Sequence, residues 1–179
     1  MSDDFVSAVV SRSGRRRRLD RGAFLFHRGD PVAAVFVVGR GSIELTRFQQ
    51  GGRPIVLQRA GPGQLVAEAS VYSAAYHCDG LAAEATVVHE LPRAAFLDLL
   101  AGDPALFHSW AAHLAREVQS ARVRSEVLSR HTVADRLDGW LTWTGGGLPA
   151  RGQWRSVAAQ IGVSPEALYR ELAKRRRSS

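Results

Sequence analysis

The amino-acid sequence changes its character at Pro92, and this change constrains the fold more than any other feature. Before Pro92, short runs rich in β-branched and aromatic residues alternate with turn signals at residues 28–31 (RGDP), 50–52 (QGG) and 61–63 (GPG). That spacing is typical of antiparallel all-β domains. After Pro92 the pattern becomes helical. We therefore predict an α+β fold in which an antiparallel β-roll, starting near Leu19, precedes a helical region.

The helical region contains a long periodic segment that opens with Asp103, a good N-cap, and Pro104, a favoured first helical residue. A heptad pattern of apolar and small residues follows, with alternating steps of four and three: Phe107, Ala111, Leu114, Val118, Ala121, Ser125 and Leu128. A helix of roughly 25 residues, at 1.5 Å per residue, would extend past a small roll. We expect these residues to form a homodimer interface. The alternative is that the stripe packs on its own roll.

The C-terminal part of the chain carries the clearest motif, WRSVAAQIGVSPEALYREL at residues 154–172. Ala158 allows two helices to cross closely, Gly162 permits a left-handed turn, and Ser164 with Pro165 can start a new helix. Two short helices joined in this way form a helix-turn-helix, whose second helix can enter the major groove of DNA. A plain helical hairpin is the alternative.

Charge favours the DNA-binding interpretation. The chain has a net charge of +7 and a sequence pI near 10.8. From residue 151 onward there are seven basic residues and only two acidic ones. An anionic partner such as double-stranded DNA fits this end of the chain. A solvated basic tail is the alternative.

Composition argues against several other classes of protein. The single cysteine excludes an internal disulfide and any Cys-x-x-Cys site, and no apolar run is long enough for a membrane span. We therefore expect a cytoplasmic protein with no membrane partner. A metal-dependent cupin would need a His-x-His cluster, which is missing, and no nucleophile elbow or phosphate loop occurs. A cysteine hydrolase would need a general base beside Cys78, and the adjacent His77 need not be positioned for that role. We therefore expect that the protein is not an enzyme.

The order of a β-roll, a long helix and a helix-turn-helix resembles the bacterial Crp/Fnr family of transcription regulators, over roughly residues 19–175. LDRGAFLFHRGDPVAAVFVVGRGSIEL, QLVAEASVYS and SPEALYREL carry the resemblance. It implies a sensor domain at residues 1–102, a dimerisation helix at 103–131 and a helix-turn-helix at 132–179. It also implies a homodimer on a two-fold-related operator, with RNA polymerase as a further candidate partner.

The resemblance implies which residues of the second helix contact DNA. Ser164, Glu166 and Arg170 match positions that contact phosphates and base edges, and Glu166 and Arg170 can read cytosine and guanine. Pro165 stands where many members have a base-reading arginine. We expect the basic run at residues 174–177 to replace the phosphate contacts of the family's wing, for which no chain remains. The predicted DNA-binding set is Ser164, Glu166, Tyr169, Arg170, Lys174, Arg175 and Arg176.

The sensor region departs from the members that bind cyclic nucleotides. Glu68 matches their glutamate, but Cys78 and Asp79 fall where they have Arg-Ser, and Ala121 and Arg122 replace a Thr-Ser pair. A carboxylate would repel the cyclic phosphate, so we expect no binding of cyclic AMP. A cyclic-nucleotide regulator with Arg122 as the phosphate partner is one alternative.

We predict instead that residues 76–79 (YHCD) form a rebuilt sensor site with His77 and Cys78 as its principal ligands. Thiolate and imidazole suit Cu(I) or Zn(II) better than haem, and one cysteine cannot hold an iron–sulfur cluster. Glu68, Asp79 and His113 are candidates for further ligands. Thiol oxidation of Cys78, a ligand-independent regulator with a filled pocket, and an ordinary buried cysteine are the alternatives.

Overall fold

The computed structural model describes residues 3–48 and 54–178, and residue contacts divide the chain into two compact units, Met1–His113 and Leu114–Ser179. The boundary falls inside the long helix α3 (Pro104–Ser129). The finer division into residues 1–102, 103–131 and 132–179 stays a prediction. None of the described helices is both long and apolar enough to cross a membrane.

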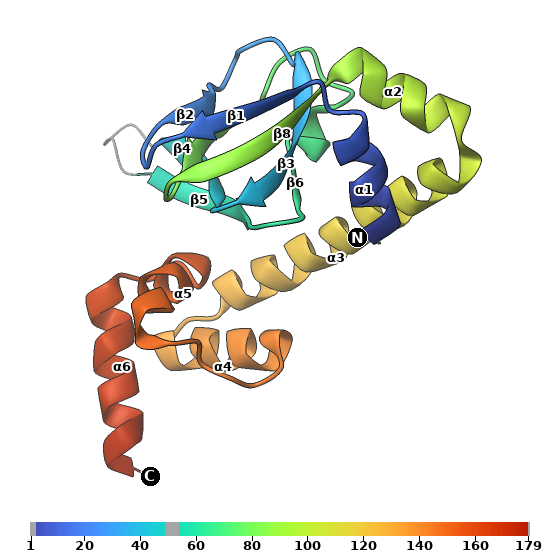
Figure 1. Cartoon of the computed structure of the whole chain (residues 1–179). Coiled ribbons are helices and arrows are strands. Elements are labelled where there is room, and N and C mark those ends of the chain that lie inside the picture. The colour runs from blue at the N-terminus through green and yellow to red at the C-terminus, as the bar shows by residue number, and fades with distance from the viewer. Residues whose placement is uncertain (1–2, 49–53, 179) are drawn as a thin grey trace. The chain divides into compact units, whose positions relative to one another are not determined.

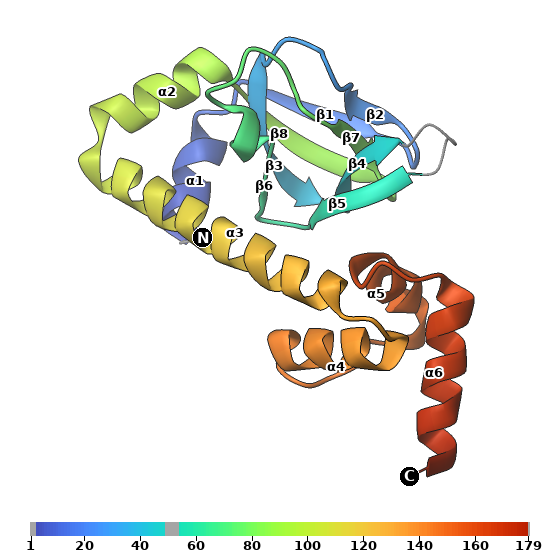
Figure 2. The same cartoon turned by 180° about the vertical axis from the view of Figure 1, so that it is seen from behind.

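The first unit contains two antiparallel four-stranded sheets, as predicted (Figure 1). One sheet has the order β1-β8-β3-β6 and the other β2-β7-β4-β5. Figure 2 shows β7 between β2 and β4. The strands are β1 (Arg15–Leu19), β2 (Phe24–Phe26), β3 (Ala34–Arg40), β4 (Ile43–Phe48), β5 (Pro54–Ala60), β6 (Leu65–Val66), β7 (Asp79–Ala82) and β8 (Thr86–Pro92).

The two sheets share one core because alternate residues of each strand point inward. Phe36 and Val88 from the first sheet join Phe26, Ile43 and Leu45 from the second in a single buried cluster. The first unit also contains the helices α1 (Asp3–Ser11) and α2 (Arg93–Gly102), the 3-10 turn η1 (Glu68–Ser70) and the first turns of α3.

Helix α3 begins where the sequence predicted it. The Asp103 Oδ1 atom accepts hydrogen bonds from the backbone N–H groups of Ala105 (2.9 Å) and Leu106 (3.2 Å), so Asp103 is an N-cap. Near its start, Trp110 is almost fully buried and contacts the rings of Phe5 and Phe96, with ring centroids 6.1 and 5.1 Å away. These aromatic contacts hold the first turns of α3 against α1 and α2.

The second unit is a small helical domain. It comprises the end of α3, α4 (Val133–Thr144), the 3-10 turn η2 (Arg151–Gln153), α5 (Trp154–Gln160) and α6 (Pro165–Ser178). Its core is built from the apolar residues that the motif supplies together with α3 and α4: Val127, Leu137, Trp140, Val157, Ala158, Ile161, Leu168 and Leu172. The predicted helix-turn-helix is therefore present as α5 and α6.

Candidate nucleic-acid interface

The turn between α5 and α6 fixes where the second helix starts. Gly162 has a φ of 65°, and a Cβ atom at this position would lie 2.8 Å from the Leu128 Cδ2 atom. A glycine is therefore favoured both by the left-handed backbone and by the close packing. The Ser164 hydroxyl oxygen then accepts a hydrogen bond from the Ala167 N–H group at 3.2 Å and caps α6.

Helix α6 has one buried face and one exposed face. Leu168 and Leu172 are buried in the core of the second unit, whereas Glu166, Tyr169 and Arg170 are exposed. Towards the C-terminus the exposed face is basic and surrounds an open hollow of about 600 Å³, lined by Arg170, Ala173, Lys174, Arg176 and Arg177. This face presents several guanidinium groups and the Lys174 ammonium group, and cations of this kind contact phosphates in nucleic-acid complexes.

Glu166 lies at the exposed first turn of α6. Its pKa is lowered because its carboxylate interacts with its own backbone N–H group and the Ser164 hydroxyl, and because Arg155 and Arg170 carry positive charge nearby. The carboxylate therefore stays ionised and can act as a hydrogen-bond acceptor. Arg155, on the exposed surface of α5, belongs to this group although sequence reasoning did not include it.

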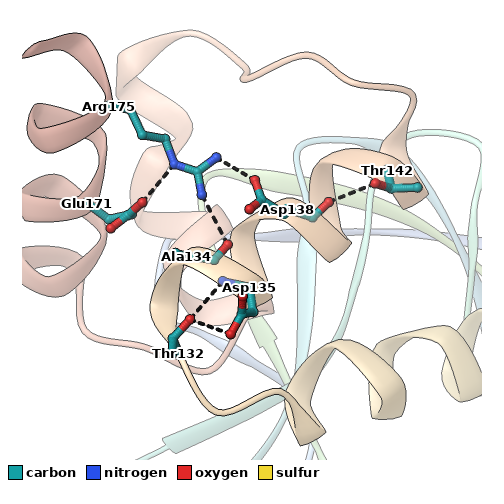
Figure 3. Close-up of polar contacts among 7 residues, drawn as sticks. All are labelled: Thr132, Ala134, Asp135, Asp138, Thr142, Glu171 and Arg175. Carbon is teal, nitrogen blue, oxygen red and sulfur yellow. Dashed lines mark hydrogen bonds and ion pairs between the residues drawn. The ribbon is translucent and has the colours of Figure 1, made fainter. Parts of the chain in front are cut away.

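Arg175 contacts Glu171 on its own helix and Ala134 and Asp138 on α4 (Figure 3). Its guanidinium donates to the Glu171 Oε1 atom (2.8 Å), the Asp138 Oδ1 atom (2.5 Å) and the Ala134 carbonyl oxygen (3.1 Å). These hydrogen bonds to carboxylates raise the pKa of Arg175. Ala134 and Asp138 belong to α4. The Arg175 hydrogen bonds therefore link α6 to α4 and orient the exposed face of α6.

The start of α4 is itself capped, which gives Arg175 a well-defined partner helix. The Thr132 hydroxyl oxygen accepts a hydrogen bond from the Asp135 N–H group at 3.0 Å and lies 2.6 Å from the Asp135 Oδ2 atom (Figure 3). Thr142 Oγ1 donates to the Asp138 carbonyl oxygen at 2.9 Å. Both contacts are local to α4.

Trp154 and Tyr169 form an aromatic pair beside the exposed face, with ring centroids 5.9 Å apart. The guanidinium carbons of Arg176 and Arg151 lie 5.8 and 5.9 Å from the centroid of the Trp154 ring. Contacts of this kind orient cations on aromatic surfaces. Tyr169 and Arg176 were predicted site residues, whereas Arg151 was found only from the structure.

In the predicted sensor region, Cys78 is only 2% exposed and belongs to the apolar core of the roll. Burial raises the pKa of the Cys78 thiol to about 11, although the nearby Arg47 charge acts in the opposite direction. A thiol in this environment is mostly protonated at neutral pH, and the thiolate, the form that attacks electrophiles, is scarce.

The other predicted sensor residues have separate contacts. The His77 Nδ1 atom lies 2.9 Å from the Ser70 hydroxyl, and burial together with the positive charge of Arg47 lowers the pKa of His77. Asp79 accepts a hydrogen bond from the Arg28 N–H group and lies 3.5 Å from the His27 Nδ1 atom.

Glu68, in η1, and His113, in α3, are both buried. Among the residues that the structure describes, no three His, Cys, Asp or Glu side chains come together as a metal-binding group.

The interior of the roll beside Cys78 is filled by aromatic rings. Phe26 stacks on Tyr76 with ring centroids 3.9 Å apart and on Phe36 at 5.9 Å. The Tyr76 hydroxyl donates to the Ala34 carbonyl oxygen at 2.7 Å, which anchors the ring. A Cβ atom at Gly80 would lie 2.9 Å from the Phe26 ring, so the strand and the aromatic stack are in tight contact.

The predicted heptad residues lie on the exposed side of α3. Phe107 and Val118 are each 50% exposed and Leu128 is 38% exposed. Ala111, Ala121 and Ser125 are also exposed, and Leu114 is partly buried. The buried residues of the same helix, Trp110, His113 and Val127, lie outside this set. One face of α3 thus carries a stripe of exposed apolar side chains, which a partner could cover.

Comparison with known proteins shows which family and which relatives the chain resembles. Residues 16–103 match the cyclic nucleotide-binding domain. The chain is 31% identical over 124 residues to the cyclic AMP receptor protein of Thermus thermophilus. The aligned region covers 69% of this chain and 57% of that protein. It is 28% identical over 157 residues to the transcriptional activator protein anr of Pseudomonas aeruginosa, covering 88% and 62%. The chain thus spans about three fifths of the length of these relatives.

Solved structures share the fold. FixK2 from Bradyrhizobium japonicum matches with a TM-score of 0.77 at 18% identity, covering 92% of this chain and 85% of that chain. The catabolite activator protein of Thermus thermophilus matches with a TM-score of 0.58 at 26% identity, covering 99% and 85%.

Proposed function

Because the chain belongs to the Crp/Fnr family of transcription regulators, we propose that it acts as a homodimer that binds a two-fold-related site on double-stranded DNA through α6. The exposed basic face of α6, opposite Leu168 and Leu172, is the observation that carries this proposal. The role is regulatory rather than catalytic, as it is for the relatives. A cytoplasmic location and contact with RNA polymerase accord with this role.

The exposed stripe of α3 supports a dimer, and the dimer would have a consequence for α6. The exposed stripe of α3 contains Phe107, Val118 and Leu128, and pairing with a second copy would remove these side chains from water. A two-fold axis along this stripe would also duplicate α6. Helix-turn-helix dimers bind half-sites about one helical turn, roughly 34 Å, apart.

Replacing Arg170 by Ala tests the DNA-contacting role. The Arg170→Ala variant should bind the operator about 1–3 kcal/mol more weakly, because a guanidinium that reads guanine is lost, while nonspecific affinity falls less. The operator is first selected from a random-sequence library with the parent protein, and affinities are then measured by fluorescence anisotropy at fixed salt.

Arg21→Ala is the matched control, since it removes one exposed arginine from the roll and leaves α6 intact. An Arg170→Ala protein that keeps the parent's preference for the selected site over random DNA would contradict the assignment. Equal losses for Arg170→Ala and Arg21→Ala would point to net charge alone.

For the sensor, we propose that the roll is filled by its own side chains, as in the ligand-independent alternative. The stacked rings of Phe26, Phe36 and Tyr76 and the buried Cys78 thiol support this proposal. The competing hypotheses of a Cu(I), Zn(II) or haem site at His77 and Cys78 require the Cys78 side chain to leave the core. A cyclic nucleotide held by Arg122 requires that exposed side chain to turn into the roll.

The reactivity of Cys78 with iodoacetamide separates the filled roll from a metal site at His77 and Cys78. With a thiol pKa of about 11, alkylation at pH 8 should be roughly two orders of magnitude slower than for a free cysteine, because only the thiolate reacts. The rate should rise about tenfold per pH unit up to the pKa. Alkylation is followed by mass spectrometry of the intact chain.

The same reaction in denaturant is the control, and there Cys78 should react like an ordinary cysteine. Fast alkylation of the folded protein at pH 8, together with protection by stoichiometric Zn(II) or Cu(I), would overturn the filled roll and favour the metal site.

A further inference from the structure

The outer surface of the first sheet contains a basic hollow that plays no part in the proposed function. It has a volume of about 480 Å³ and lies over β1, β3 and β8. Its lining residues are Arg16, Arg18, Leu19, Asp20, Gly39, Arg40, Ala85, Thr86, Val87 and His89. The volume falls in the range of small-molecule sites in proteins.

Strand register brings the basic residues of the hollow together. Arg16 pairs with His89, and Val87 pairs with both Arg18 on β1 and Arg40 on β3. Paired residues of neighbouring strands share a face of the sheet. Arg18 and Arg40 therefore flank Val87 from the two sides of β8.

Two glycines shape the hollow. A Cβ atom at Gly39 would lie 3.0 Å from the His89 Nε2 atom, so the imidazole packs closely on Gly39 and a side chain there would displace it by a few tenths of an ångström. Gly41, with a φ of 79°, turns the chain directly after Arg40, and a Cβ atom there would lie 2.5 Å from Thr86 Oγ1. Close packing of Gly39 on the His89 ring and of Gly41 on Ala85 and Thr86 thus shapes the hollow.

The charge in the hollow is unbalanced. Three guanidinium groups meet one carboxylate, that of Asp20. Among the described residues, the guanidinium groups of Arg16, Arg18 and Arg40 take part in no hydrogen bond or ion pair. Arg17, on the opposite face of β1, differs: it donates to the Leu25 carbonyl oxygen at 3.3 Å and lies 3.7 Å from the Glu90 carboxylate. A concave site of one sign attracts counter-ions.

We propose that this hollow binds a small anion that carries more than one phosphate group. The planar guanidinium donates two parallel hydrogen bonds to a phosphate, and its charge persists at every physiological pH. Neighbouring strands are about 4.8 Å apart, so Arg18 and Arg40 approach from points roughly 10 Å apart. A chain of phosphates spans that distance better than a single phosphate does. The hollow lies on the outer face of the first sheet and contains no residue of α6, so it would give the regulator an effector site that its filled roll does not supply.

Isothermal titration calorimetry of the full chain with inorganic triphosphate, in roughly 0.15 M salt to screen weak surface binding, tests the proposal. We expect one saturable site per chain. Arg18→Ala and Arg40→Ala should each weaken binding about tenfold or more, since each removes a charge-assisted contact. The double variant should show no saturable heat. Monophosphate should bind at least tenfold more weakly than triphosphate.

Arg15→Ala is the matched control, because Arg15 lies on the same strand, is exposed, and does not line the hollow. Its affinity for triphosphate should match that of the parent within about twofold. An equal loss in Arg15→Ala, no saturable heat with the parent, or equal affinity for monophosphate would overturn the proposal.

The basic face of α6 could also attract triphosphate, and Arg170→Ala separates the two locations. If that variant abolishes the heat while Arg18→Ala and Arg40→Ala leave it unchanged, the hollow is not the site. DNA affinity of Arg18→Ala and Arg40→Ala is measured in parallel and should be unchanged, so the proposals for DNA and for triphosphate fail independently.

Discussion

Val118→Glu should convert the proposed dimer into monomers and lower the affinity for a two-fold-related operator by about two to four orders of magnitude. Val118 is 50% exposed and lies at the centre of the heptad stripe of α3. In a two-fold interface each residue faces the same patch on its partner. The substitution would therefore bring two carboxylates into an apolar seam and oppose association by desolvation and like-charge repulsion.

The loss in DNA affinity follows from valency. A dimer that holds one half-site binds the second one at a high effective concentration, and a monomer loses that advantage, which is typically worth 10²–10⁴ in affinity. Sedimentation equilibrium at micromolar concentration measures the association, and anisotropy with the selected operator measures the binding.

Gln119→Glu provides the matched control, because Gln119 is exposed on the same helix, lies outside the heptad stripe and gains the same charge. That variant should remain dimeric. A Val118→Glu protein that sediments as a dimer would show that a different surface joins the two copies.

The face of α3 was predictable from the sequence because a long helix imposes a simple rule. The heptad steps from Phe107 to Leu128 select one side of the helix, and that side is the one left exposed. The buried side was harder to recognise, since it depends on Trp110 meeting Phe5 and Phe96 from two other helices. Phe5 lies about a hundred positions from Trp110 in the sequence, and a contact over such a separation leaves no periodic signal.

Strand β1 was not predicted. Four consecutive arginines from residue 15 look like a solvated charge cluster, yet they pair with β8 from Arg15↔Glu90 to Leu19↔Thr86. The strand lies at the edge of its sheet, where charged side chains are tolerated and discourage pairing with other chains. Only Leu19, at its end, is buried in the core.

The position of α6 could be predicted from the sequence, but the contacts of each of its basic residues could not. Residues 174–177 are consecutive cations, and successive residues of a helix point about 100° apart. Arg175 therefore faces α4, where Asp138 accepts its hydrogen bond, while Lys174 and Arg176 line the exposed hollow. Asp138 is 37 positions away in sequence, so the pairing emerges only from the fold.

A similar limit applies to His77 and Cys78. The two residues are adjacent and lie in a bend directly before β7, so their spacing in the sequence does not fix the directions of their side chains. In the structure Cys78 joins the core cluster, whereas His77 contacts Ser70. The residue types of His77 and Cys78 suggest a pair of metal ligands. Whether they can bind one metal ion depends on where their side chains point, which the sequence does not give.

Leu168→Ala should destabilise the second unit by about 2–5 kcal/mol, which is the usual cost of removing a buried leucine side chain. Leu168 is fully buried among Leu137, Val157 and Ile161, and its side chain joins α6 to the rest of the unit. The higher helix propensity of alanine offsets only a few tenths of a kcal/mol. Operator binding should weaken in proportion to the unfolded fraction, because α6 presents Arg170 only when it is docked on this core.

Urea unfolding followed by tryptophan fluorescence suits the measurement, since Trp140, Trp143 and Trp154 belong to the second unit and Trp110 to the first. Leu148→Ala is the matched control: Leu148 is 40% exposed, so the same substitution should cost less than about 0.5 kcal/mol. If Leu168→Ala unfolds at the same urea concentration as Leu148→Ala, α6 is not held by this core. The basic face of α6 would then need a different support, and Arg175, through Asp138, is the contact that would have to supply it.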